Sequence, residues 1–164
     1  MSGQQAENPE FAQIVEAVVL GMPAARHLGF SFRRVERGEV EIVQPYRTEL
    51  TEHNGNFQGG VIGSLADFAG GSAAGTLLPA GWVNMTVDYT VKLLAPARGE
   101  YLLARGRVVK PGKAITVAAA DVYGVDQGAE TLCATALVTM RNIDLGGAGG
   151  TLAVAAAAHG TGDA

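Results

Sequence analysis

The chain has 164 residues, a formal net charge of −4 at pH 7 and a single cysteine, Cys133. This length is typical of one domain with a fair-sized core. The acidic balance, with lysines and arginines spread along the chain, argues against a nucleic-acid-binding protein. One cysteine excludes an intramolecular disulfide and a cysteine-rich metal site, and the histidines lack metal-ligand spacing. No metal site is therefore expected.

The N-terminal ten residues are polar and lack the charged-then-apolar order of a secretory signal. The sequence therefore predicts a soluble cytoplasmic protein with no membrane partner. Residues 1–24 are expected to hold a loose lead-in and a surface helix over 9–20, with Asn8 as N-cap and Gly21 as C-cap. Residues 22–28 are expected to form a connector.

Six stretches alternate apolar and polar residues or are rich in strand-forming side chains, and short Gly- and Pro-containing links separate most of them. The last four are expected to form an antiparallel meander. The third of these contains three consecutive alanines, which are poor strand formers and would let a subunit or ligand come close. The predicted strands cover residues 29–37, 39–44, 82–94, 101–110, 114–123 and 131–141.

Between the second and third strands, the stretch 52–79 reads as a turn, a glycine pair and one long helix. Apolar residues recur at helical spacing, and Asn54 and Asn56 are good N-cap candidates. Five glycines weaken the helix by roughly 0.5–1 kcal/mol each, so something must wrap it, and an enclosing sheet fits. The alternative is a lipid-embedded helix, which Asp67, Gln58 and the high Gly and Ala content disfavour. Asp67 stands out in this stretch, because it is the sole ionisable group after the turn and is flanked by apolar neighbours. Carboxylates avoid such surroundings unless they are paired or functional.

These elements predict an α+β domain in which a six-stranded antiparallel sheet wraps one long central helix. The domain is expected to span residues 25–143. Residues 144–164 are low-complexity Gly and Ala, and a mostly disordered tail is expected there.

The segment from Gln58 to Asp67, QGGVIGSLAD, resembles the hotdog-fold acyl-CoA thioesterases, in particular the phenylacetic-acid-degradation and 4-hydroxybenzoyl-CoA branch. In that family a His-Gly-Gly is followed after six residues by Asp or Glu. A second match, NMTVDY followed by LAPA, begins at Asn84. The resemblance covers about residues 25–142. It implies an α+β hotdog fold and hydrolysis of an aryl- or medium-chain acyl-CoA to a carboxylic acid and CoA.

The resemblance also implies roles for individual residues. Asp67 is the nucleophile or the general base for water, and the backbone N–H of Gly59 binds the thioester carbonyl. Thr86 helps to orient water or the carboxylate across the subunit interface. The sites then form between subunits of a homodimer or homotetramer, with coenzyme A as part of the substrate and no separate cofactor. Such chemistry agrees with the need for a nucleophile and an oxyanion donor.

Two positions depart from the family pattern. Gln58 replaces the usual His and can donate a hydrogen bond but cannot shuttle a proton. Glu52 falls where the family has Asn or Gln, and it could orient water, act as a second base or simply face solvent. Six further residues are expected to contact the substrate. Asn54 lies in the loop, Gly60 at the helix start and Ser64 at a small-residue position of the helix. The other three lie in a basic turn between two strands: Lys110, Gly112 and Lys113.

The same residues allow plainer interpretations. Asp67 could be a structural carboxylate, Thr86 an ordinary strand residue, and Gln58 a loop anchor. Arg105 and Arg107, which share one strand face, could join the basic turn in binding phosphate or form an ordinary solvated hairpin end. Rival functions are a non-hydrolytic acyl-CoA-binding or sensing module and an enoyl-CoA hydratase. A dinucleotide-binding fold lacks the required strand–GxGxxG–helix order.

Overall fold

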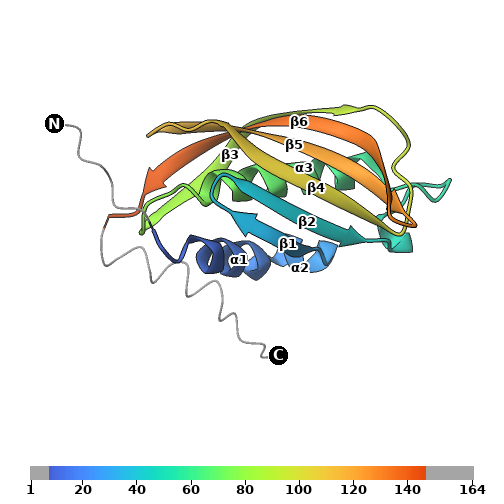
Figure 1. The fold of residues 1–164 in the computed structure, drawn as a ribbon, viewed down its shortest axis with the longest axis horizontal. Coiled ribbons are helices and arrows are strands. Elements are labelled where there is room, and N and C mark those ends of the chain that lie inside the picture. The colour runs from blue at the N-terminus through green and yellow to red at the C-terminus, as the bar shows by residue number, and fades with distance from the viewer. Residues whose placement is uncertain (1–7, 147–164) are drawn as a thin grey trace.

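In a computed structural model, residues 8–146 are described as two short helices, one long helix and one sheet (Figure 1). Of the predicted tail over 144–164, residues 147–164 therefore lie outside the described residues, and the last strand reaches Asp144. In chain order the elements are α1 (Phe11–Gly21), α2 (Pro23–Leu28), β1 (Ser31–Glu36), β2 (Glu39–Pro45), a 3-10 turn (Thr48–Leu50), α3 (Gly59–Gly75), β3 (Trp82–Leu93), β4 (Tyr101–Lys110), β5 (Ile115–Asp126) and β6 (Ala129–Asp144).

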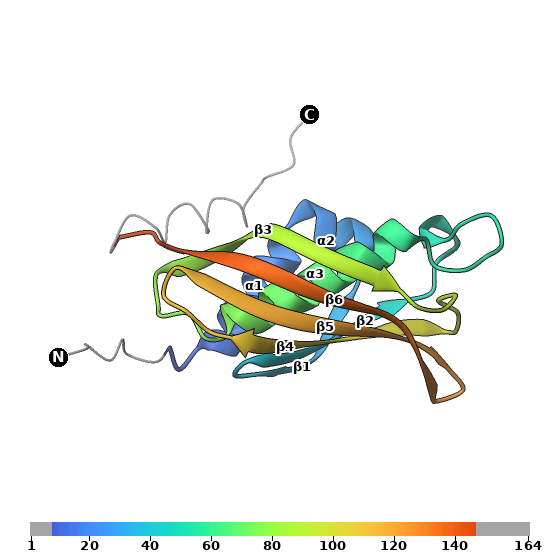
Figure 2. The same ribbon diagram turned by 90° about the horizontal axis from the view of Figure 1, so that it is seen from above.

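The six strands form one antiparallel sheet in the order β1-β2-β4-β5-β6-β3. Figures 1 and 2 show this sheet curving over α3, with α1 and α2 on the same side of the sheet as α3. The expected meander of four strands is wrong for β3, which pairs with β6 rather than β4. The link from β3 to β4 crosses the end of the sheet, so β3 becomes an edge strand.

The core explains why α3 needs so many small residues. A Cβ added at Gly106 on β4 would lie only 2.2 Å from the backbone oxygen of Ala69. Ala118 and Ala120 on β5 are fully buried, and a Cβ at Gly70 would lie 3.6 Å from that of Ala118. The alanine run of β5 therefore lets the helix backbone approach the sheet. The expectation that it admits a subunit or ligand is wrong for this inward face.

The N-terminal region differs from the sequence prediction in two places. The expected connector over 22–28 contains the helix α2. Pro23 is its first residue, and Gly29, with a φ of 75°, is its C-cap. Proline suits a first helical turn, and glycine readily adopts the left-handed conformation that ends a helix. In α1, the Asn8 side chain accepts a hydrogen bond from the Glu10 N–H at 3.0 Å, but Glu10 occupies the N-cap position and Met22 the C-cap position.

The two edges of the sheet differ in character. β1 is short and carries charged side chains that form ion pairs, as edge strands commonly do to avoid pairing with other chains. β3 is 12 residues long, and its large apolar side chains are exposed: Met85 by 58%, Val87 by 55%, Tyr89 by 44% and Leu93 by 55%. An edge of this kind is a ready template for another strand.

Candidate active site

Asp67 lies near the middle of α3 and meets β3 through Thr86. The Thr86 hydroxyl donates a hydrogen bond of 2.8 Å to Asp67 Oδ1. Thr86 therefore reaches Asp67 within one chain, and its expected role across a subunit interface stays a prediction. A register shift between Thr86 and Asp88 marks a bulge at this point of β3. Bulges commonly redirect a side chain next to an active site.

The Asp67 carboxylate is poorly solvated for a charged group. Burial raises its pKa above the usual range, and the hydrogen bond from Thr86 opposes that rise. Within residues 8–146, the Thr86 hydroxyl is the one hydrogen-bond donor described for this carboxylate. A carboxylate with unused acceptor capacity and a raised pKa has the properties of a nucleophile or a general base.

An apolar pocket of about 420 Å³ begins at Asp67, and we call it the α1–α3 pocket. One of its walls is α1, another is the start of β3 from Trp82 to Thr86, and its floor is α3. This volume falls within the range of ordinary small-molecule sites. Its lining includes three valines of α1 and three residues of α3: Val15, Val18, Val19, Asp67, Gly71 and Gly75.

The start of α3 presents a free backbone donor. Gln58 is the N-cap, and its Oε1 accepts hydrogen bonds from the N–H groups of Gly60 at 2.6 Å and Val61 at 3.2 Å. Gln58, rather than Asn54 or Asn56, therefore caps the helix. In the described part of the chain, no acceptor is recorded for the N–H of Gly59, the first residue of α3. Unpaired N–H groups in a first helical turn favour an anionic oxygen.

Glu52 is occupied by its own loop. Its two carboxylate oxygens accept hydrogen bonds from the backbone and side-chain amides of Asn54 and Asn56, at 2.8 to 3.1 Å. The backbone N–H of Asn54 makes the largest contribution to lowering the pKa of Glu52. His53 Nδ1 lies 3.1 Å from the same carboxylate. Glu52 and Asn54 thus hold the turn that leads into α3, and neither lines the α1–α3 pocket.

Ser64 and Gly60 lie on the same face of α3 as Asp67, at helical spacing of three and seven residues before it. Ser64 is half-buried and Gly60 is exposed, and neither lines the α1–α3 pocket. Their expected contact with the substrate stays a prediction.

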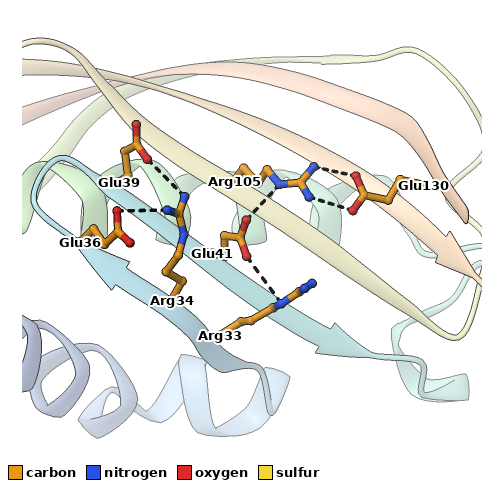
Figure 3. Close-up of polar contacts among 7 residues, drawn as sticks. All are labelled: Arg33, Arg34, Glu36, Glu39, Glu41, Arg105 and Glu130. Carbon is orange, nitrogen blue, oxygen red and sulfur yellow. Dashed lines mark hydrogen bonds and ion pairs between the residues drawn. The ribbon is translucent and has the colours of Figure 1, made fainter. Parts of the chain in front are cut away.

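Charged side chains on the outer face of the sheet form a network of ion pairs (Figure 3). Arg105 forms two hydrogen bonds to Glu130, at 2.6 and 2.8 Å, and one to Glu41 at 3.1 Å. Glu41 in turn lies 3.6 Å from Arg33. Hydrogen bonds to Glu130 are the main cause of a raised pKa for Arg105. Arg105 is therefore already committed to carboxylates and is not available for the phosphate-binding role considered from the sequence.

The other basic residues considered for phosphate binding lie at or near the β4–β5 turn. Lys110 and Lys113 are exposed there, and Arg107 is exposed further back on β4. For these three side chains, no ion pair is recorded within the described residues. The Asn142 side chain anchors Gly112, because its Nδ2 donates a hydrogen bond of 2.8 Å to the Gly112 carbonyl oxygen. The turn is thus a firmly anchored basic loop.

Sequence reasoning missed most of the α1–α3 pocket. The apolar face of α1 was predicted, but helical periodicity alone does not say which surface such a face covers. Asn84 was also missed as a structural link: its Nδ2 donates to the Gly71 oxygen at 2.9 Å and ties the start of β3 to α3. Only the packing of α1 across α3 creates the pocket.

A curved antiparallel sheet around one long helix is the arrangement of the hotdog fold, and in this chain a half-buried carboxylate on that helix lies beside an apolar pocket. The thioesterase superfamily model matches residues 54–131. An inferred esterase of Halobacterium salinarum is 33% identical over 127 residues, which cover 74% of this chain and 82% of that protein. The chain belongs to the thioesterase superfamily, which indicates hydrolysis of a thioester.

Solved structures agree with this membership. A thioesterase family protein from Silicibacter pomeroyi superposes with a TM-score of 0.79 at 34% identity, covering 82% of this chain and 98% of that one. A thioesterase from Haemophilus influenzae gives a TM-score of 0.68 at 25% identity, covering 74% and 83%. The hotdog fold predicted from the sequence is confirmed.

Between residues 8 and 146, no group of three or more His, Cys, Asp or Glu side chains could hold a metal ion. Over the same range, no helix is both long enough and apolar enough to cross a bilayer.

Proposed function

We propose that this protein hydrolyses acyl-CoA thioesters to a carboxylic acid and free CoA, with Asp67 as the reacting carboxylate. The observation that carries the proposal is the half-buried Asp67, which holds a single hydrogen bond from Thr86 and stands at the end of an apolar pocket. The pocket suits an acyl group, and the carboxylate suits attack on the carbonyl carbon beside it.

Asp67 acts in one of two ways with the same overall balance. As a general base it takes a proton from water, and the resulting hydroxide adds to the thioester carbonyl; as a nucleophile it adds to the carbonyl itself, and water later hydrolyses the anhydride. In both cases the C–S bond breaks, and the CoA thiolate leaves and takes up a proton. Thr86 holds the carboxylate in place. Gln58 lacks a titratable proton, so its free Nε2 serves as a donor only.

The developing oxyanion needs a donor, and the unpaired N–H of Gly59 is the candidate. Asp67 follows Gly59 by eight residues, which is about 12 Å along a helix. One chain therefore cannot direct both groups at the same carbonyl carbon. The proposed site takes Asp67 from one subunit and Gly59 from the other.

The open edge of β3 offers the means of assembly. Thr86, near one end of the strand, contacts Asp67, while the Leu93 side chain at the other end lies 3.0 Å from a Cβ added at Gly59. Antiparallel pairing of β3 with its copy about a two-fold axis between these points brings one chain's Thr86 beside the other's Leu93. Asp67 of one subunit then meets Gly59 of its partner, in at least a homodimer.

The phosphates of CoA are assigned to the anchored basic turn. Lys110 and Lys113, with Arg107 nearby, are cations for which no ion pair is recorded in residues 8–146, and Gly112 lies between the two lysines. Phosphate groups suit such a cluster.

The proposal also includes the phenylacetic-acid-degradation branch of the family. A phenylacetic-acid-degradation-related protein of Ralstonia eutropha has a TM-score of 0.65 and 25% identity, over 73% of this chain and 90% of that one. This similarity supports the proposed branch.

The test is release of free thiol from a panel of acyl-CoA thioesters, comparing wild type with Asp67→Asn. Wild type should hydrolyse at least one thioester, and the variant should lose about 10²–10⁴-fold in kcat/KM. Asp67→Asn should remain folded, because it removes a charge whose pKa burial has raised. Circular dichroism and the melting temperature check this.

Three results would contradict the proposal. Tight acyl-CoA binding without hydrolysis would indicate a binding or sensing module. Formation of 3-hydroxyacyl-CoA from enoyl-CoA would indicate a hydratase. Hydrolysis that survives in Asp67→Asn would place the chemistry elsewhere.

A further inference from the structure

The α1–α3 pocket extends well past the reacting carboxylate, and the chemistry proposed above uses only its mouth. We propose that its remainder is a channel for a straight, medium-length, apolar acyl chain, and that Gly75 and Val15 set the length of chain accepted. This inference rests on the proposed function, since it identifies the acyl group of the same substrate. It favours an aliphatic chain over the aryl group that the sequence left equally open.

The shape of the pocket is elongated. The residues of α3 that line it run from Asp67 to Gly75, at positions 67, 68, 71, 72 and 75, and so lie along one face of the helix. Eight residues of helix span about 12 Å. A thioester whose carbonyl lies beside Asp67 therefore finds space that continues in one direction, parallel to the helix axis.

The volume is too large for a single aromatic ring. An apolar cavity of about 150 Å³ accommodates benzene, whereas the α1–α3 pocket has about 420 Å³. A single ring would leave more than half of it unfilled, and a flexible chain would fill it. The walls that α1 contributes are apolar, including Val15, Val18 and Val19. A charged or strongly polar acyl group would lose its hydration against them.

One position controls how far a chain can enter. At Gly75, the last residue of α3, an added Cβ would lie 3.4 Å from Val15 Cγ2 of α1. A single methyl group there would contact α1 and take up space in the pocket that both helices line. Leu78 and Trp82, further along the chain than Gly75, also line the pocket. The absence of a side chain at Gly75 therefore leaves this part of the pocket wider for an acyl chain that extends from Asp67.

The experiment measures kcat/KM for acetyl-, hexanoyl-, decanoyl- and phenylacetyl-CoA in wild type, Gly75→Ala and Val15→Ala. Wild type should prefer decanoyl-CoA to phenylacetyl-CoA. Gly75→Ala should lower kcat/KM for decanoyl-CoA by about tenfold and leave acetyl-CoA nearly unchanged, because one methylene in an apolar pocket is worth about 10–200-fold. Val15→Ala should shift the preference toward longer chains.

Two matched controls separate pocket effects from general ones. Gly21→Ala makes the same change at the last residue of another helix, where an added Cβ meets nothing within 4 Å. Val40→Ala removes the same atoms as Val15→Ala from a buried valine of β2 that does not line the pocket. Both should leave the ratio of decanoyl- to acetyl-CoA activity as in wild type, although Val40→Ala should lower the melting temperature.

A wild-type preference for phenylacetyl-CoA, or an equal loss on all four substrates in Gly75→Ala, would overturn the inference. If wild type hydrolysed none of the four, the proposed function would fail instead. Calorimetric binding of decanoyl-CoA and acetyl-CoA would then decide the pocket by itself. Tighter binding of decanoyl-CoA that Gly75→Ala abolishes would support the channel, and equal binding would reject it.

Discussion

Two carboxylates near α3 have opposite surroundings. Glu52, in the loop before the helix, accepts four hydrogen bonds from amide groups of Asn54 and Asn56, and its pKa is lowered. Asp67, in the helix itself, has one hydrogen bond from Thr86, and burial raises its pKa. Both residues came from the sequence as candidates for the same chemistry. The structure gives Glu52 a structural environment and Asp67 a reactive one.

The difference shows which property marks the candidate base. A carboxylate whose acceptor sites are all used stabilises the loop that uses them, and its lone pairs are not available to water or to a substrate. A carboxylate that is partly dehydrated and only once hydrogen-bonded keeps its lone pairs and gains basicity. The predictions that follow test this contrast, from the largest expected effect to the smallest.

After replacement of Asp67 itself, the largest effect is expected at the start of α3. Gly59→Pro removes the proposed oxyanion donor, and proline suits the first position of a helix whose N-cap Gln58 has extended backbone angles. We expect a loss of about 10²–10³-fold in kcat. Gly59→Ala keeps the N–H and introduces a similar Cβ near Leu93, so it is the control. Equal losses in the two variants would mean that the effect is steric and that the N–H has no role.

The same variant tests whether Asp67 and Gly59 act across subunits. A mixture in which Gly59→Pro and Asp67→Asn subunits exchange forms heterodimers with one intact site. Activity should then recover in part, although each variant alone is inactive. No recovery in demonstrated heterodimers would contradict the two-chain site.

An intermediate effect is expected from Thr86→Val, which removes the hydroxyl partner of Asp67 at nearly constant shape. The hydrogen bond from Thr86 lowers the pKa of Asp67, so its loss should raise that pKa further. The reactive form is the ionised one, and the acid limb of the kcat/KM profile should therefore move to higher pH. The loss on the plateau should be about tenfold, as for a hydrogen bond to a charged group. An unshifted limb would show that Asp67 does not control the profile.

The smallest effect on activity is expected from Glu52→Gln. Glu52 has a lowered pKa in the folded protein, so its ionised form adds stability above its unfolded pKa of about 4.3. That stability is lost as the pH falls through the folded pKa. Glu52→Gln should lower the melting temperature at pH 7, and the difference from wild type should shrink below about pH 4. A large fall in kcat with an unchanged acid limb would restore Glu52 as a catalytic candidate.

Several features were predictable because their causes are local. The wrapped helix followed from apolar spacing over residues 52–79, and the break between the last two predicted strands contains Gly128, which adopts the positive φ of 80° that glycine readily allows. Asp67 stood out because a lone charge in a small-residue helix is rare. Capping was predicted less well: Gln58 reaches two N–H groups that the more usual asparagines do not.

The features that sequence reasoning missed depend on distant parts of the chain. Pairing of β3 with β6, rather than β4, is decided by which strands can close around α3. The commitment of Arg105 to Glu41 and Glu130 joins residues on three strands. In each case the sequence shows the side chain, and only the folded sheet supplies its partner.

The amino-acid sequence by itself determined the elements other than α2, the sheet that wraps one long helix and the position of Asp67, because periodicity, glycine content and turn residues act over a few neighbouring positions. Tertiary structure alone decided that the Thr86 hydroxyl of β3 lies within hydrogen-bonding distance of Asp67 on α3. It also decided that α1 closes an apolar pocket over Gly71 and Gly75. These are contacts between segments far apart in the chain, and their geometry depends on how the sheet curves around the helix.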